Sequence, residues 1–358
     1  MKQKFNMQAD IVTHVNGPYL VLANHNMDWD SLVIAMGFPK QMYFVASEHI
    51  FRKGILTRLL MRYFAPISRI KGSLAVSTAM EIIRRLRRGD NVCIFAEGNR
   101  SFNGLTCPIL PSTGKLVRSC GATLVTYRLE GGYFTQPRWG YTLRRGRMHG
   151  KCVGVYPAQT LRAMSVDQVN DMLVRDLFED AYAQQIQEPV AFEGKRLAEG
   201  LEHSLYICPQ CGRIGTLHSK GSSFFCDCGL SVTYQNTGFL LGGRFKTITQ
   251  WDEWQHEELC RIARNLGDAP AFCDDDLTLL RVGDDHASEI AARGEASFFA
   301  DRLDVGDVSI PISDIIDFEI HGRSIAVFST GSAHYELISG STYCGRKYVQ
   351  LYRILKAR

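Results

Sequence analysis

Long hydrophobic runs are missing from this 358-residue chain. No stretch approaches the roughly 18 uninterrupted apolar residues that a membrane-spanning helix needs, and the mean hydropathy is −0.11. The N-terminal residues MKQKFNMQAD contain neither an apolar core nor a small-residue cleavage site, so we expect no secretion signal. Repeats and low-complexity segments are also missing. The length favours two or three globular domains.

Acidic residues are scarce in one part of the chain. Residues 51–150 hold 18 Lys and Arg but 4 Asp and Glu, whereas residues 251–300 hold 4 basic and 12 acidic residues. The formal net charge of +4 therefore hides a basic block and an acidic one. A block this basic suits a polyanionic ligand, an anionic membrane or nucleic acid. The alternative is a solvated face of Arg-rich helices.

A disulfide framework is not expected either, although the chain has 11 cysteines. Seven are scattered, some inside apolar runs such as NVCIFA, and the total is odd. This usage is typical of a reducing compartment, where a buried cysteine acts as a small hydrophobic residue. We therefore expect a cytoplasmic protein. The other four are clustered in the sequence: Cys208, Cys211, Cys226 and Cys228.

Strand and helix patterns alternate over residues 1–195, which predicts an α/β domain with a mostly parallel sheet. Ligands of such sheets bind beyond the carboxyl ends of the strands. An amphipathic helix is expected over Ser73–Arg88, and Ser165 with Gln168 forms a capping box that opens a helix to about Gln184. The expected strands are Tyr19–Ala23, Met42–Ala46, Asn91–Phe95 and Thr123–Leu129.

The pattern changes after residue 200. Residues 204–234 hold the clustered cysteines, and residues 235–300 show no clear periodicity. From Ala300 onward, turn signals such as HGR and TGS separate short alternating segments, and a helix near Gly345–Ala357 closes the chain. We predict a small antiparallel β domain over residues 235–358, whose strand rhythm and final helix resemble pleckstrin-homology-like modules.

A histidine and an acid follow the first expected strand. The segment Asn24-His25-Asn26-Met27-Asp28-Trp29-Asp30 places His25 where a general base would lie at the carboxyl end of the sheet. A carboxylate at Asp30 would fix the imidazole tautomer and stabilise the imidazolium that forms. A substrate hydroxyl would then take the place that serine has in a catalytic triad. The alternative is that Asp28 and Asp30 cap the next helix.

Two further polar clusters follow strand-like runs. Phe95–Ser101 contains Glu97, Gly98 and Arg100, and an arginine with backbone amides beside a glycine can hold an oxyanion or a phosphate. Arg69 precedes a helix N-terminus, which favours anions. The alternative for Glu97 and Arg100 is a surface ion pair of little energetic value. Three clusters after three strands predict one common site.

These blocks resemble the signatures of the glycerolipid acyltransferase family, which includes the 1-acylglycerol-3-phosphate acyltransferases. Asn24-His25-x4-Asp30 resembles its first block, Arg69 matches the arginine of the second, and FAEGNRS resembles the third block, FPEGTRS. The chain departs from that block at Ala96 and Asn99. It also lacks the proline of the fourth block in TLVTY, residues 123–127, so the resemblance does not extend to the acyl-donor contacts of that block.

The resemblance implies a reaction and a set of roles. In that family the histidine deprotonates the acceptor hydroxyl, which attacks the thioester of acyl-CoA or acyl carrier protein, and the aspartate supports the histidine. By position, His25 and Asp30 would form this general-base dyad. Contacts with the acceptor phosphate would fall to Arg69, Glu97, Gly98 and Arg100. The implied acceptor is a lysophospholipid, with 1-acylglycerol-3-phosphate giving phosphatidic acid.

The cysteine cluster resembles a zinc ribbon over residues 204–234. Cys208-Pro-Gln-Cys211-Gly supplies one pair and Cys226-Asp-Cys228-Gly the other, with one residue between the second pair rather than two. Four thiolates fill a tetrahedral Zn²⁺ site and leave no open position, so a bound zinc would be structural. The alternatives are four buried thiols or an iron centre.

Membrane contact is expected from residues 51–64, FRKGILTRLLMRYF, where basic and apolar residues interleave. Such a segment lies in the headgroup region of an anionic membrane, so we expect peripheral association with the inner face of the cell membrane. The alternative is a helix packed on the sheet of the domain. A different reading of the whole chain is a zinc-ribbon protein that binds nucleic acid or protein, with an inactive acyltransferase-like domain. Because the basic excess surrounds the expected site and not the ribbon, we expect no nucleic-acid partner.

Overall fold

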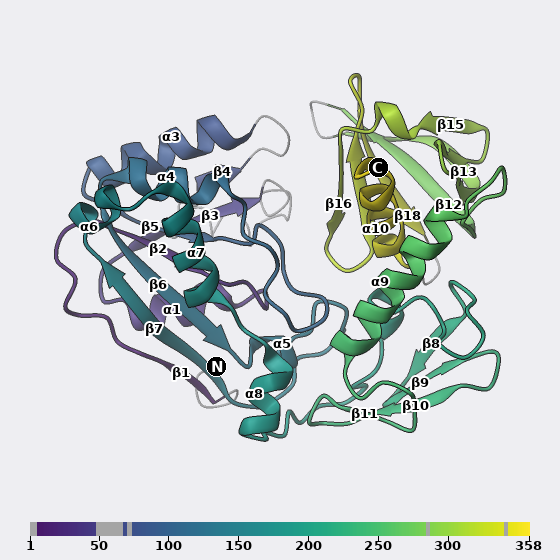
Figure 1. Cartoon of the computed structure of the whole chain (residues 1–358), viewed down its shortest axis with the longest axis horizontal. Helices are drawn as coiled ribbons and strands as arrows, with labels where there is room; N and C mark the ends of the chain where they lie inside the picture. The colour runs from purple at the N-terminus through teal and green to yellow at the C-terminus, as the bar shows by residue number, and fades with distance from the viewer. Residues whose placement is uncertain (1–5, 48–66, 70–73, 284–286, 340–342) are drawn as a thin grey trace. The chain divides into compact units, whose positions relative to one another are not determined.

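The computed structural model describes residues 6–47, 67–69, 74–283, 287–339 and 343–358 (Figure 1). The chain divides into two compact units. The first comprises Met1–Pro137 and Arg144–Glu193, and the second comprises Arg138–Leu143 and Gly194–Arg358. The division into three domains, residues 1–195, 204–234 and 235–358, stays a prediction.

The first unit is built on a sheet with the strand order β1-β7-β6-β2-β5-β3-β4. The central strand, β2, pairs in parallel with β5 on one side and β6 on the other, and β7 runs antiparallel to β6. The strands are β1 (Met7–Ala9), β2 (Tyr19–Ala23), β3 (Met42–Ser47), β4 (Ile67–Arg69), β5 (Asn91–Phe95), β6 (Thr123–Glu130) and β7 (Met148–Tyr156). The four expected strands are confirmed, and the carboxyl ends of β2 and β5 meet at one edge.

Both faces of this sheet are covered, which explains why β2 is buried along its whole length. Val21 packs in a core cluster with residues of α1, while the alternate residue Leu22 packs in a second cluster with residues of α3, α4 and α7. The helices are α1 (Asp30–Gly37), α3 (Leu74–Arg87), α4 (Ser112–Cys120), α5 (Gly132–Thr135), α6 (Ala158–Ala163), α7 (Val166–Leu177) and α8 (Ala181–Gln187).

The helix expected from Ser165 to about Gln184 is interrupted. The capping box is confirmed, because Ser165 Oγ accepts from the Gln168 amide at 3.1 Å and the Gln168 side chain accepts from the Ser165 amide at 2.8 Å. The helix ends at Leu177, however, and α8 starts after Asp180, whose carboxylate caps it. The cap at Asp180 competes with continuation of the helix, and the break leaves Phe178 and Glu179 outside both helices.

The second unit holds two antiparallel sheets and their helices. The smaller sheet has the order β11-β10-β9-β8 and the larger one β15-β14-β13-β12-β18-β17-β16. The smaller sheet comprises β8 (Leu217–Lys220), β9 (Ser223–Cys226), β10 (Ser231–Tyr234) and β11 (Leu240–Leu241). The larger comprises β12 (Phe272–Val282), β13 (Ser288–Phe298), β14 (Arg302–Val305), β15 (Val308–Pro311), β16 (Asp317–His321), β17 (Ile325–Ser329) and β18 (His334–Ser339). The helical segments are η2 (Leu201–His203), α9 (Ile248–Arg264), η3 (Ile312–Asp314) and α10 (Gly345–Lys356).

The expected hairpins and closing helix are confirmed, but the irregular reading of residues 235–300 is wrong. That stretch contains α9 and the long strands β12 and β13. Trp251 and Leu259 are buried on α9 among many charged residues, which obscured the helical period. The strand pattern of β12 is broken by register shifts, one of them between Asp274 and Leu277. A sequence period cannot be read across such a shift.

A buried ion pair joins the two longest helices of the second unit. Arg346 on α10 and Asp252 on α9 form a bidentate contact, with Nη1–Oδ1 at 2.6 Å and Nη2–Oδ2 at 2.7 Å. Arg346 Nη1 also donates to the Ser204 carbonyl at 2.8 Å. Both side chains are shielded from solvent, with 11% and 6% of their surfaces exposed.

Removal of one partner of this pair is expected to destabilise the second unit. Asp252→Ala leaves a guanidinium buried without its carboxylate, which costs about 3–5 kcal/mol of unfolding free energy. Urea unfolding followed by tryptophan fluorescence measures this loss. Glu319→Ala is the control, because the Arg353–Glu319 pair is exposed and such pairs contribute about 1 kcal/mol or less. An equal loss in both variants would contradict the assignment.

Candidate active site

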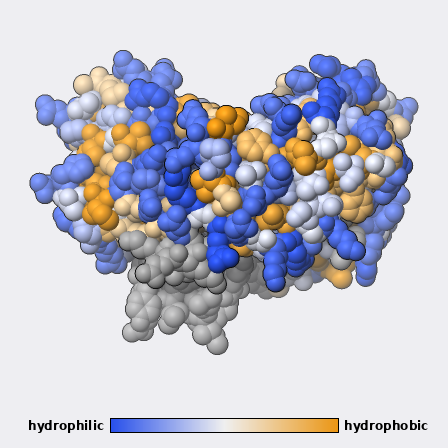
Figure 2. All heavy atoms as spheres, turned by 90° about the horizontal axis from the view of Figure 1, so that it is seen from below, coloured by the Kyte–Doolittle hydropathy of each residue, from blue (hydrophilic) through white to orange (hydrophobic). Residues whose placement is uncertain are grey.

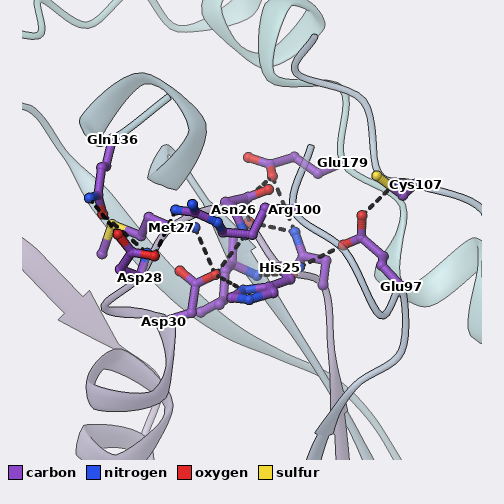
Figure 3. Close-up of polar contacts among 12 residues, drawn as sticks. His25, Asn26, Met27, Asp28, Asp30, Glu97, Arg100, Cys107, Gln136 and Glu179 are labelled. Atoms are coloured by element: carbon purple, nitrogen blue, oxygen red, sulfur yellow. Dashed lines mark hydrogen bonds and ion pairs between the residues drawn. The ribbon is translucent and has the colours of Figure 1, made fainter. Parts of the chain in front are cut away.

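His25 lies just beyond the end of β2 and faces a buried carboxylate (Figure 3). Its Nδ1 is 2.9 Å from Asp30 Oδ2, and the Asp30 side chain has no exposed surface. The same oxygen accepts the backbone amides of Asn26 at 2.6 Å and Met27 at 2.9 Å. Asp30 therefore shapes the turn that leads into α1 and also orients the imidazole. The alternative, in which Asp28 and Asp30 cap the next helix, is not seen, since the N-cap of α1 is Trp29 without a side-chain hydrogen bond.

The surroundings of His25 fix the orientation of its ring. A hydrogen bond from Nδ1 to a carboxylate fixes the proton on Nδ1 and leaves the lone pair on Nε2. The ring stacks on Phe95 of β5, with centroids 4.2 Å apart and an interplanar angle of 15°. About a quarter of the side chain is exposed, at 24%. A substrate hydroxyl can therefore approach a ring whose rotation is restricted by one hydrogen bond and one aromatic face.

Glu97 joins the loop after β5 to the His25 loop. Its Oε1 accepts the His25 backbone amide at 2.6 Å, and its Oε2 accepts the backbone amide of Cys107. The side chain is buried, and this burial raises the pKa of Glu97 to about 8, although both amide hydrogen bonds act to lower it. Gly98 follows with a φ of +65°, which allows the chain to turn sharply at this point. A buried carboxyl group engaged with two amides differs from the phosphate contact that the resemblance implied for Glu97.

Arg100 lies near the same loop but has an acidic neighbour. Its Nη1 is 2.9 Å from Asp28 Oδ1, and the Arg100 side chain is 14% exposed. Gln136 holds Asp28 from the other side, because its Nε2 donates to Asp28 Oδ2 at 2.8 Å. An anionic group of a ligand can therefore pair with the Arg100 guanidinium by displacing Asp28.

Two sequence predictions concern residues that lie partly or wholly outside the described part of the chain. The backbone of Arg69 ends β4, where it pairs with Ser47 of β3, but its side chain lies outside the described residues. The basic and apolar segment 51–64 lies outside them as well.

Sequence reasoning missed a third buried acid, Glu179. It lies in the break between α7 and α8, and its Oε2 accepts hydrogen bonds from the side-chain amides of Asn24 and Asn26, the two residues that flank His25. Burial raises the pKa of Glu179 to about 8. No local motif marks this residue, and only its contact across 155 positions with Asn24 identifies it.

The clustered cysteines converge as the spacing predicted. Their four Sγ atoms lie within 4.8 Å of one another, with Cys208–Cys228 at 3.7 Å and Cys211–Cys226 at 3.8 Å. Sulfur atoms at the corners of a tetrahedron around Zn²⁺, each about 2.3 Å from the ion, are about 3.8 Å apart. This set of four thiol donors could therefore hold one metal ion.

None of the described helices combines the length and the apolar character that a crossing of the bilayer requires. In one view of the surface, hydrophobic side chains occur in small groups among hydrophilic ones (Figure 2). Such a mixture is normal for protein surfaces and does not by itself mark a membrane-binding face.

One of three comparisons with known proteins finds a family match, in the first part of the chain. The family model described as Acyltransferase matches residues 4–130, a segment that contains both His25–Asp30 and Glu97–Arg100. The predicted architecture is confirmed: an acyltransferase-like α/β domain, a cysteine cluster that fits a zinc-ribbon-like segment, and an antiparallel β sheet.

No match was found among curated proteins. One solved structure that resembles the chain is the 1-acyl-sn-glycerophosphate (LPA) acyltransferase PlsC from Thermotoga maritima. The two are 17% identical, and the alignment covers 51% of this chain and 74% of the other, with a TM-score of 0.42. A likeness this weak carries no argument about function.

The pKa of Glu97 predicts a pH dependence of stability. Its folded-state pKa is raised, so the folded protein holds this proton while the unfolded chain releases it, and stability falls as pH rises from about 5 to about 8. Thermal unfolding of the wild type and of Glu97→Gln over this range tests the effect. The variant should show a smaller decrease in melting temperature, while Glu188→Gln, at an exposed site, should follow the wild type. A parallel decrease in all three proteins would contradict the assignment.

Proposed function

We propose that this chain, whose residues 4–130 match the acyltransferase family, transfers a fatty acyl group to the hydroxyl of a lysophospholipid. The donor is acyl-CoA or acyl carrier protein, and the acceptor is 1-acylglycerol-3-phosphate, which gives phosphatidic acid. One observation carries the proposal: within the matched segment, the His25 imidazole is hydrogen-bonded at 2.9 Å to the buried Asp30. The family match supports acyl transfer, and the choice of donor and acceptor comes from the resemblance of the motifs.

The proposed chemistry uses His25 as general base. Its Nε2 takes the proton of the acceptor hydroxyl while the oxygen attacks the thioester carbonyl carbon. The tetrahedral intermediate then collapses, the carbon–sulfur bond breaks, and the thiolate leaves. Asp30 stabilises the imidazolium between these steps through its contact with Nδ1. A thiolate is a good leaving group, so the cleavage does not require a metal.

The acceptor phosphate is proposed to bind Arg100, Arg69 and the backbone at Gly98. Arg100 supports the proposed phosphate contact because it pairs with Asp28, which lies on the same loop as His25. Arg69 is included on the resemblance of the second block and on its position at the end of β4. Glu97 acts differently in this proposal. It positions the His25 loop through the backbone amide of His25, while its other oxygen holds the amide of Cys107, and it does not contact phosphate.

Peripheral contact with an anionic membrane on its cytoplasmic face is also part of the proposal. A two-chain phospholipid product partitions into a bilayer, so an enzyme that forms it gains from contact with the surface. The sequence of residues 51–64 supports this idea by its interleaved basic and apolar residues.

Replacement of the general base is expected to abolish most of the activity. His25→Ala should lower kcat by about 100-fold or more, because the hydroxyl loses its proton acceptor. The assay is release of free thiol from acyl-CoA in the presence of 1-acylglycerol-3-phosphate. His149→Ala is the control, since this histidine pairs with Asp10 and its loss should change kcat by less than about twofold.

The outcomes of this assay separate the readings of the chain. Near-normal transfer by His25→Ala rules out the general-base mechanism. An inactive wild type, tested with both acyl-CoA and acyl carrier protein donors, favours the alternative of a binding protein with an inactive acyltransferase-like domain.

We further propose that the four clustered cysteines bind one structural Zn²⁺. Their sulfur separations fit a tetrahedral zinc site, and four protein ligands leave no position open for chemistry. Elemental analysis of the purified protein should find about one zinc per chain. Cys226→Ser should lose the metal, whereas Cys260→Ser on α9 should retain it. A wild type without metal and with four reactive thiols would reject the site.

A further inference from the structure

We propose that Glu179 is a positioning residue for His25 and acts on it through Asn24 and Asn26. Glu179 lies beyond the segment that matches the acyltransferase family, which ends at residue 130. The catalytic consequence rests on the proposed function, because it takes His25 as the general base. The link between Glu179 and the His25 loop rests on the contacts alone.

The two asparagines hold the backbone on both sides of His25. Asn24 Nδ2 donates to the Leu129 carbonyl at 2.9 Å, and Asn24 Oδ1 accepts the Leu129 amide at 2.7 Å. Asn26 Nδ2 donates to the same carbonyl at 3.0 Å. These hydrogen bonds connect the end of β2 to the end of β6 through the two residues adjacent to His25 in the sequence.

Glu179 completes this arrangement as the common acceptor. Its Oε2 takes hydrogen bonds from Asn26 Nδ2 and, at 3.2 Å, from Asn24 Nδ2. Its Oε1 takes the Gly131 amide at 3.1 Å. One carboxyl group therefore connects the His25 loop with the turn between β6 and α5. Since both of its oxygens act as acceptors, a side chain with a single acceptor oxygen cannot replace it fully.

Glu179 is itself held firmly. Its backbone amide donates to Thr106 Oγ1 at 2.7 Å, and its carbonyl accepts the Thr106 amide at 3.1 Å. The residue is 2% exposed. Burial of a carboxyl group lowers the stability of the fold unless hydrogen bonds compensate for it. Solubility does not require an acid at a buried position, so we assign Glu179 a role at the site that its hydrogen bonds reach. The break between α7 and α8, closed by the cap at Asp180, places Glu179 at this point.

Loss of Glu179 is expected to change the orientation of the His25 ring rather than the affinity for the substrates. Substrate contacts assigned to Arg100 and Gly98 do not include Glu179. Loss of Glu179 therefore should lower kcat and leave KM for both substrates nearly unchanged. A base displaced by a fraction of an ångström from its working position costs about tenfold or more in rate.

The test compares three variants of the full chain. Glu179→Gln exchanges one acceptor oxygen of the link for an NH₂ group, and Asn26→Ala removes one of its donors. Each should lower kcat by about tenfold with KM values within about twofold. Asp176→Asn is the matched control. This acid is also buried and lies three residues earlier on α7, but it accepts from Thr126 at 2.9 Å and Tyr156 at 2.6 Å instead of the His25 loop. It should lose stability and keep kcat within about twofold of the wild type.

A second measurement does not depend on activity. In protein labelled with ¹⁵N-histidine, the Nδ1 proton of His25 bonded to Asp30 gives a signal that His25→Ala identifies by its loss. The signal should shift or broaden in Glu179→Gln and in Asn26→Ala but not in Asp176→Asn. Thermal unfolding confirms that each variant is folded.

The outcomes distinguish the two proposals. If the wild type is inactive, or His25→Ala stays active, the proposed function or its mechanism fails, and the histidine signal alone decides the role of Glu179. If Glu179→Gln and Asn26→Ala keep both the signal and kcat, the positioning role is overturned while the proposed function stands. An equal loss of kcat and signal in Asp176→Asn also overturns it, because the effect would then be general destabilisation.

Discussion

The hydrogen bond between His25 and Asp30 is the interaction on which the first unit's candidate site depends. Asp30 Oδ2 receives the imidazole together with the backbone amides of Asn26 and Met27. Among the described residues, Asp30 Oδ1 is buried and has no hydrogen-bond partner. A single oxygen therefore shapes the turn between β2 and α1 and sets the direction of the ring. A change at Asp30 would therefore alter the backbone turn and the orientation of the His25 ring together.

Three buried carboxyl groups surround this one histidine, and they interact unfavourably with one another. Asp30 helps to raise the pKa of Glu97, and Glu97 helps to raise that of Glu179, in both cases after the larger effect of burial. Each acid offsets part of its burial by accepting hydrogen bonds from the His25 loop or from its neighbours. Burial of the two apolar clusters on the faces of the sheet stabilises the fold and offsets the cost of burying these acids. Such a concentration of buried acids is typical of functional sites.

The sequence predicted the site residues that follow directly after an expected strand. His25 and Glu97 follow apolar strands, and parallel strands bring their carboxyl ends to one edge, so their convergence could be expected. The cysteine spacing likewise predicted the cluster. Glu179 could not be predicted, because its partners lie far away along the chain and no periodic pattern links them. The buried role of Glu97 was also hidden, since a motif gives residue types but not the direction in which a side chain points.

The ion pair between Arg100 and Asp28 has a consequence for which anions the site can hold. Arg100 is already paired with Asp28, so an incoming anion must compete with the Asp28 carboxylate for the guanidinium. Asp28 is well exposed, so water can solvate its carboxylate when the pair with Arg100 is given up. A phosphate monoester carries nearly two charges at neutral pH. A diester carries only one charge and gains less from the exchange, so under the proposed role of Arg100 a monoester would compete with Asp28 better than a diester.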